Sequence, residues 1–240
     1  MSTIFSEGES LKHFWKAPRD IYQKEDFQTA LPKVLGIYLM MWIPMFLVMG
    51  VLYTLESKGI VDNLDNHAIE QFLETMPFAV VFVLAGIVQP TLEELGFRLF
   101  LRPKYAGISF FIWIVFLAAI CFQSLPKNLA IVLIGALSVF LYFYFSDWRH
   151  RPEVIWGKYF KGLFWLSVFS FGLAHAVNFV AVDVPLWAIP LMVLPQIVAG
   201  YFLGFTRLRF GISWAIFFHC LHNSLLLLGY LINEHYLHLT

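Results

Sequence analysis

Charge is scarce in this chain: only 13% of the 240 residues are Asp, Glu, Lys or Arg, about half the share found in soluble domains. Hydrophobic residues make up 60%, which excludes a water-soluble globule and a disordered chain. The two cysteines, Cys121 and Cys220, lie in apolar runs and define neither a disulfide framework nor a zinc motif. Because 16 basic residues balance 16 acidic ones, no nucleic-acid partner is indicated. The composition predicts a protein whose partner is the lipid bilayer.

Long uncharged runs are abundant. A membrane-spanning helix needs about 20 mainly apolar residues. Runs of this kind cover residues 34–55, 77–101, 108–125, 129–146, 162–182, 184–206 and 210–233. Backbone polar groups cannot stay unpaired in lipid, and no run alternates as a barrel strand does, so each run is predicted to be helical. We therefore expect an all-α polytopic membrane protein with about seven transmembrane helices.

No internal repeat, low-complexity tract or long linker interrupts the chain, so one membrane domain over residues 1–240 is predicted. Residues 33–240 form its helical bundle. Residues 1–32 mix aromatic and charged side chains, which favours a helix lying on the cytosolic surface of the membrane. Residues 65–76 show a similar amphipathic pattern, and the orientation below places them on the outer side.

The basic residues predict the orientation. Of the 16 Lys and Arg residues, 14 lie in the N-terminal segment and in the second-to-third, fourth-to-fifth and sixth-to-seventh connections. These segments all fall on one side of a seven-helix topology, and only Lys58 and Lys127 fall on the other. Since basic loops stay on the inner side, the N-terminus is predicted to be cytosolic and the C-terminus outside. The short connections and small size favour a prokaryotic plasma membrane.

Several ionisable and polar residues occur inside the predicted helices, where each charge costs about 2.5–3.5 kcal/mol at the bilayer centre. Measured by helical rise from the inner ends of their helices, Glu93, His175, His219 and Asn223 lie roughly 12–20 Å deep, so these groups are expected to share one cavity open to the cytosol. The whole set is Glu93, Glu94, Arg98, His175, His219 and Asn223, with His222 beside them.

Spacing assigns a role to each of these groups. Glu94 and Arg98 are four residues apart, so they can form a buried ion pair, whereas Glu93 points about 100° away and is left for chemistry. Glu93 and a neighbouring His175 can take a proton from water. His219 and Asn223 share a helical face and can donate hydrogen bonds to an oxyanion. Pro90 removes a backbone hydrogen bond just before the acidic pair.

Three motifs carry a family resemblance: EExxxR over residues 93–98, FxxxH over residues 171–175, and HxxxN over residues 219–223. In order and in placement on separate helices, they resemble those of the CAAX protease and bacteriocin-processing (CPBP, or Abi) family of glutamate-type intramembrane endopeptidases. The resemblance covers roughly residues 77–233. Leu99 departs from it, since members often have glycine there.

The resemblance implies an endopeptidase that needs no metal or other cofactor. Its substrate would be a membrane-anchored or membrane-inserted peptide, cleaved near its C-terminus or in a leader or sorting peptide. It implies that Glu93 is the catalytic base and that His175 helps to activate water. It further implies a supporting ion pair, Glu94 and Arg98, and an oxyanion-binding pair, His219 and Asn223.

Three other functions fit parts of the pattern. Glu93, His175 and His219 form a possible set of zinc ligands, although HExxH is missing. The same groups can relay protons in a coupled transporter, although inverted repeats are missing. A non-enzymatic immunity or interaction protein can keep the fold of the same family without its catalytic activity. His222 is expected to be structural, and Cys220 to be buried without acting as a nucleophile.

Overall fold

The computed structural model describes residues 2–60, 73, 75–105, 152–176 and 187–233. Helices and short connections make up these residues, with no strand among them, in agreement with the predicted all-α class. The helices are α1 (Ser2–Lys16), α2 (Phe27–Ser57), α4 (Phe78–Val83), α5 (Gln89–Phe97), α8 (Pro152–Ala174), α9 (Ile189–Met192), α10 (Leu194–Phe210) and α11 (Ile212–Ile232). A π-helical segment, η1 (Leu84–Val88), joins α4 to α5, and two 3-10 turns follow α5: η2 (Leu99–Leu101) and η3 (Pro103–Tyr105).

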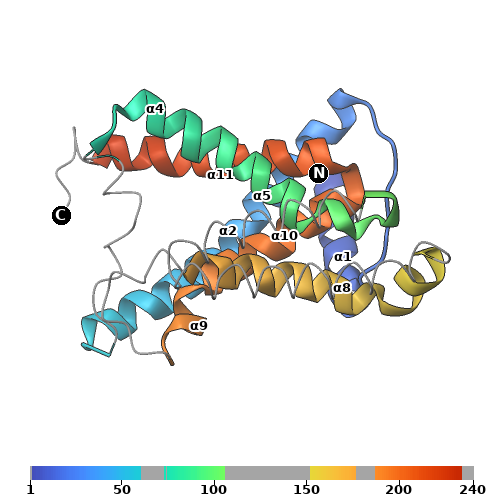
Figure 1. Cartoon of the computed structure of the whole chain (residues 1–240), viewed down its shortest axis with the longest axis horizontal. Helices are drawn as coiled ribbons and strands as arrows, with labels where there is room; N and C mark the ends of the chain where they lie inside the picture. The colour runs from blue at the N-terminus through green and yellow to red at the C-terminus, as the bar shows by residue number, and fades with distance from the viewer. Residues whose placement is uncertain (1, 61–72, 74, 106–151, 177–186, 234–240) are drawn as a thin grey trace, which may run out of the picture.

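Helix α10 lies at the centre of the bundle and packs against α2, α8 and α11 (Figure 1). Helix α11 runs alongside the continuous rod made by α4, η1 and α5, and it contacts η1 and α5. Phe164, Phe205 and Phe218, from α8, α10 and α11, are fully buried in the apolar core. This packing places the polar residues of α5 between α8 and α11.

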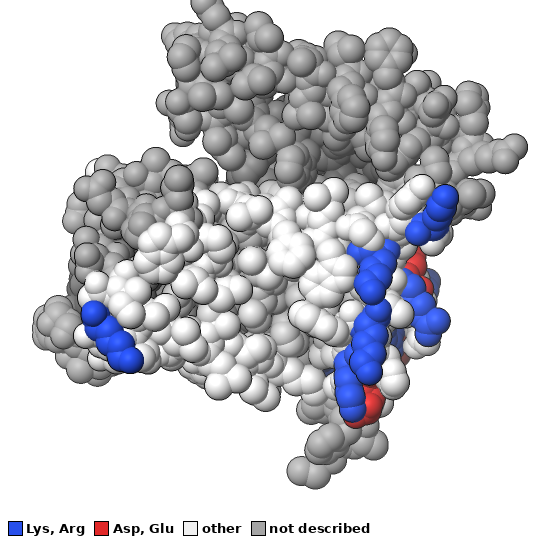
Figure 2. Space-filling model, turned by 90° about the horizontal axis from the view of Figure 1, so that it is seen from below, with Lys and Arg blue, Asp and Glu red and all other residues white. Residues whose placement is uncertain are grey.

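Three helical stretches of the described chain are long and apolar enough to cross a membrane: Phe27–Ser57, Phe78–Leu101 and Ile212–Ile232. They correspond to the runs predicted at 34–55, 77–101 and 210–233. The runs at 108–125 and 129–146, and most of the amphipathic segment at 65–76, lie outside the described residues. Figure 2 shows a broad uncharged surface, with Lys and Arg gathered mainly at the end of the bundle that carries α1.

The prediction of one continuous helix over residues 184–206 is wrong. The chain forms two helices there, α9 and α10, which meet at Val193. Pro190 and Pro195 stand in the first turns of these two helices, where a missing backbone N–H is tolerated. Helix α10 then continues past the predicted end to Phe210. It stops at Gly211, whose φ of 110° favours glycine and turns the chain directly into α11.

The N-terminal prediction needs a second correction, because residues 27–32 already belong to α2. Asp26 caps that helix by accepting a hydrogen bond from the Thr29 backbone N–H at 2.9 Å. Helix α1 also buries Leu11 and Phe14 in the protein core. The Tyr201 hydroxyl donates to the Leu11 carbonyl at 2.7 Å. Part of the apolar face of α1 thus packs on protein rather than on lipid.

The crossing of α10 and α8 requires a glycine. A Cβ at Gly204 would lie 2.8 Å from Cε2 of the fully buried Phe164. We expect Gly204→Ala to destabilise the fold by about 1–3 kcal/mol through overpacking. Gly50→Ala is the control, since a Cβ there meets no described atom within 4 Å, and we expect that change to be neutral or stabilising. Unfolding of the two variants in detergent micelles measures the difference; equal stabilities would contradict this packing.

Candidate active site

The site is built on α5, which starts with an irregular turn. The Gln89 backbone N–H donates to the Leu84 carbonyl five residues back, and Pro90 has no N–H to donate. The Ala85 carbonyl therefore has neither an α-helical donor, because the Gln89 N–H goes to Leu84, nor a π-helical donor, because residue 90 is proline. The side chain of Asn223 replaces them: its Nδ2 donates to the Ala85 oxygen at 3.0 Å. Helix α11 thus stabilises the π-helical turn that sets the rotation of α5.

Glu94 and Arg98 form the predicted ion pair, which confirms that contact. Arg98 Nη1 lies 2.8 Å from Glu94 Oε1, and both side chains are completely buried. The Arg98 guanidinium also lies 3.8 Å from the ring centroid of Phe171, a cation–π contact. Arg98 itself follows the last residue of α5, and Arg207 Nε donates to its carbonyl at 3.3 Å. The pair is therefore fixed to α8 and α10 as well as to α5.

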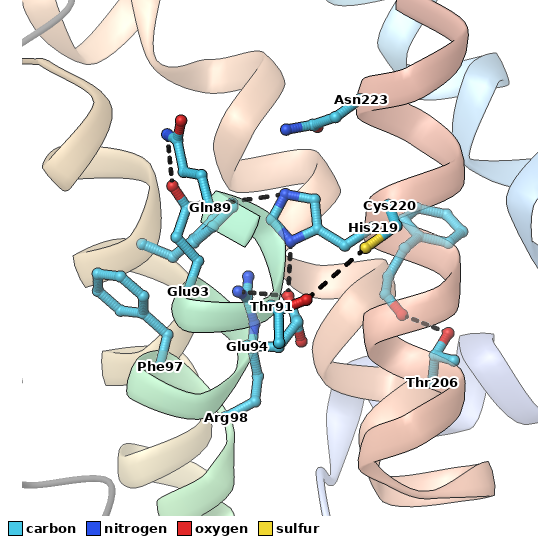
Figure 3. A network of polar contacts seen from close by, with 12 residues as sticks. Gln89, Thr91, Glu93, Glu94, Phe97, Arg98, Thr206, His219, Cys220 and Asn223 are labelled. Atoms are coloured by element: carbon cyan, nitrogen blue, oxygen red, sulfur yellow. Dashed lines mark hydrogen bonds and ion pairs between the residues drawn. The ribbon is translucent and has the colours of Figure 1, made fainter. Parts of the chain in front are cut away.

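His219 of α11 lies between the two glutamates (Figure 3). Its Nδ1 is 2.9 Å from Glu94 Oε1, and its Nε2 is 3.6 Å from Glu93 Oε2. The Glu94 carboxylate that pairs with Arg98 can only accept hydrogen bonds, so Nδ1 of His219 is the donor in this contact. In the neutral ring, Nε2 then presents a lone pair toward Glu93.

His175 brings a second imidazole near the same oxygen. It lies in the 3-10 turn that follows α8, one residue beyond the end of the helix. Its Nδ1 is 2.8 Å from the Phe171 carbonyl, which can only accept, so this nitrogen is the donor. The Nε2 atom lies 4.0 Å from Glu93 Oε2 and, in the neutral ring, also presents a lone pair.

Glu93 is 4% exposed, and its two oxygens have different surroundings. Oε1 accepts a hydrogen bond from Gln89 Nε2 at 2.9 Å. Oε2 is buried and has no hydrogen-bond partner among the described residues, although it faces the two imidazole nitrogens. Three acceptors therefore lie close together, and one water molecule can donate to two of them, Glu93 Oε2 and one imidazole Nε2.

Gln89 was missed by the sequence reasoning. Gln89 lies one helical turn before Glu93 and donates a hydrogen bond to it. The spacing of four residues between a glutamine and a glutamate is the sequence signal that points to this contact. Its contact directs Oε1 away from the imidazoles and leaves Oε2 facing them. Gln89 is thus a positioning residue of the site.

The remaining polar residues of α11 have other partners. The ring of His222 packs against Tyr38 and Trp42 of α2, with centroid separations of 6.0 and 5.5 Å. Cys220 Sγ lies 3.9 Å from Thr91 Oγ1 and 3.6 Å from the Ile87 carbonyl oxygen. These two side chains therefore lie on the flanks of the site and pack α11 against α2 and α5.

The structure thus brings Glu93, Glu94, Arg98, His175 and His219 into one cluster, and it places Asn223 beside the cluster on the Ala85 carbonyl. His219 contacts the glutamates, a partnership that helical periodicity alone did not indicate. Among the described residues, no group of three or more His, Cys, Asp or Glu side chains is arranged to hold a metal ion. Comparison with protein-family profiles, curated proteins and solved structures found no significant match.

Proposed function

We propose that the protein is an intramembrane endopeptidase of the glutamate type, similar to the CPBP family. The observation that carries this proposal is the buried Oε2 of Glu93, which has no described hydrogen-bond partner and is faced by His219 and His175 Nε2 at 3.6 and 4.0 Å. A carboxylate with two neutral imidazoles around one point suits the binding and deprotonation of water. The nucleophile is then the water oxygen, and no covalent acyl-enzyme forms.

In this mechanism, a water molecule donates one hydrogen bond to Glu93 and the other to an imidazole. Its oxygen attacks the scissile carbonyl carbon while its proton passes to the Glu93 carboxylate. The tetrahedral intermediate collapses as the proton is delivered to the amide nitrogen, and the C–N bond breaks to leave a carboxylic acid and an amine. Glu94 and Arg98 hold His219 in the tautomer whose Nε2 accepts a hydrogen bond from this water, so in this mechanism His219 orients the water and is not the oxyanion donor that its spacing predicted.

The proposed substrate is a membrane-anchored or membrane-inserted peptide, cut near its C-terminus or in a leader or sorting segment. The proposed location is a prokaryotic plasma membrane with the N-terminus in the cytosol. The gathering of Lys and Arg at the end of the bundle that carries α1 supports this orientation (Figure 2). No cofactor is required by this chemistry.

The test is quantitative proteomics of peptide termini in membranes of the native host, comparing wild type with Glu93→Ala at equal expression. We expect one or a few precursors to accumulate uncleaved in the variant, and the termini found only in wild type give the cleavage site. Identical termini under conditions in which the gene affects growth would overturn the proposal. Proton-driven uptake into vesicles would then test a transporter, and a phenotype unaffected by Glu93→Ala would indicate a non-enzymatic immunity or interaction protein.

Asn223→Ala separates two roles of this amide. If the second N–H of Nδ2 also binds the developing oxyanion, we expect the catalytic rate to fall by about 10²–10³. If Asn223 only holds the Ala85 carbonyl, the main loss is in stability, about 0.5–1.5 kcal/mol for a part-buried hydrogen bond. Measuring turnover and unfolding for the same variant distinguishes them. An unchanged rate removes the oxyanion role.

A further inference from the structure

A cavity of about 610 Å³ lies where the α10–α11 turn meets η2, η3 and the segment between α1 and α2. It is at the α1 end of the bundle (Figure 1), outside the proposed catalytic cluster. Three basic side chains line it: Lys24, Arg102 and Arg207. Its only lining carboxylate among the described residues is Glu25.

Glu25 is already neutralised by other cations. Lys33 Nζ lies 2.8 Å from Glu25 Oε2, and Arg209 bonds the other oxygen. Burial disfavours the charged form of Glu25, but the hydrogen bonds from Lys33 and Arg209 outweigh it and keep the pKa below its ordinary value. Glu25 is therefore not available as a counter-ion for the cavity.

The three lining cations are unequally paired. Arg102 has a partner, since its Nε lies 3.3 Å from Asp20 Oδ2, and its guanidinium lies over the Tyr22 ring. Arg207 is 2% exposed, and among the described residues no carboxylate lies within ion-pair distance of it, although Asp20 and Glu94 act on it from farther away. Its Nε donates to the Arg98 carbonyl, but Nη2 is buried with no described hydrogen-bond partner. A buried guanidinium without a counter-ion is strongly unfavourable, so an anion in the adjoining cavity is the expected compensation.

The amino end of α11 lines the same cavity. Gly211 supplies no side-chain cap, and Ile212, Ser213 and Trp214 are the first three residues of this 21-residue helix. Their N–H groups have no partner within the helix and none among the other described residues, since the first bond, from Ala215, goes to Gly211. Free N–H groups and the helix dipole at this end attract anions.

We propose that this cavity binds an anion of the phosphate class, held by Arg207, by Lys24 and by the N-terminus of α11. Phosphate fits because its several oxygens accept from donors arriving in different directions, which a single carboxylate matches less well. Two sources share this chemistry: a phospholipid headgroup and free phosphate. Phe27, which is 65% exposed, stacks on the cavity residue Trp214 at 5.3 Å, so an apolar surface adjoins the cavity as a lipid would require. The proposal does not depend on peptide hydrolysis.

The key variant for testing the site is Ser213→Asp, which places a carboxylate in the first turn of α11. Ser213 is exposed, and a negative charge at a helix N-terminus is favourable, so the fold should be kept while the anion is displaced. Lys24→Gln removes one exposed cation without touching a buried group. The matched controls are Gln28→Glu, which adds a negative charge nearby, and Lys58→Gln, which removes a positive charge at the far end of α2.

Full-length protein in a neutral detergent is titrated with inorganic phosphate at constant ionic strength, with melting temperature as the readout. In parallel, retention of phosphatidylglycerol against phosphatidylcholine is measured by native mass spectrometry. We expect Ser213→Asp to weaken binding at least tenfold and Lys24→Gln several-fold, with both controls within twofold of wild type. Binding of inorganic phosphate supports a free-phosphate source, and selective retention of phosphatidylglycerol alone supports a headgroup. Binding of neither probe, or equal binding by wild type and Ser213→Asp, overturns the proposal.

Discussion

Purified Glu93→Gln is expected to lose turnover by about 10²–10⁴-fold, because an amide cannot accept the proton that a general base must take from water. The fold should survive. The new amide oxygen can accept the hydrogen bond from Gln89 that Glu93 Oε1 accepts at 2.9 Å. The new amide N–H groups would face His219 and His175, whose Nε2 lone pairs lie 3.6 and 4.0 Å from Glu93 Oε2. The measurement is the rate on the substrate identified by proteomics, together with the melting temperature.

The matched control is Glu9→Gln, which removes a carboxylate that is 67% exposed on α1. It should leave both the rate and the melting temperature unchanged. Activity should also persist after treatment with a chelator, because no metal takes part in the proposed step; loss on chelation and recovery with zinc would favour the metalloprotease alternative. A Glu93→Gln protein that is folded and fully active would remove Glu93 from the chemistry.

Arg98→Met is expected to have the largest effect on stability, about 3–5 kcal/mol, because it leaves the fully buried Glu94 without its cation. Of the partners that Glu94 has among the described residues, His219 then remains, through Nδ1 at 2.9 Å from Glu94 Oε1. The cation–π contact with Phe171 is lost in the same change. Unfolding in mixed micelles with increasing SDS measures the loss.

A double-mutant cycle shows whether the loss comes from the ion pair itself. Adding Glu94→Gln to Arg98→Met removes the orphaned charge, so the double variant should be more stable than Arg98→Met alone. Arg19→Met, at an exposed position outside the bundle helices, is the control and should have little effect. If the two single changes add without coupling, the 2.8 Å contact contributes no net stability.

Part of the candidate site follows from local spacing. The ion pair of Glu94 and Arg98 lies within one turn of chain, and a helix brings residues four apart together wherever it packs. The same rule applies to Gln89 and Glu93, although Gln89 is not among the predicted site residues. The different direction of Glu93 is also a local property, since adjacent residues diverge by about 100° around a helix.

The partners of α11 did not follow from spacing. His219 and Asn223 share a helical face, but His219 contacts the two glutamates and Asn223 the Ala85 carbonyl. Periodicity indicates which residues point the same way, and it does not indicate what they meet. Those contacts depend on the π-helical turn at Leu84–Val88, which changes the rotation of α5 relative to a regular helix.

Sequence alone determined the helical class, the three described apolar stretches and the residue types of the site, because lipid requires long uncharged helices and makes each internal charge conspicuous. Only the tertiary structure decided that two imidazoles face one oxygen of Glu93. It also decided that Arg207 is buried beside a cavity without a described carboxylate partner. Both arrangements join helices distant in sequence, and their packing depends on the shapes of many side chains at once rather than on any local pattern.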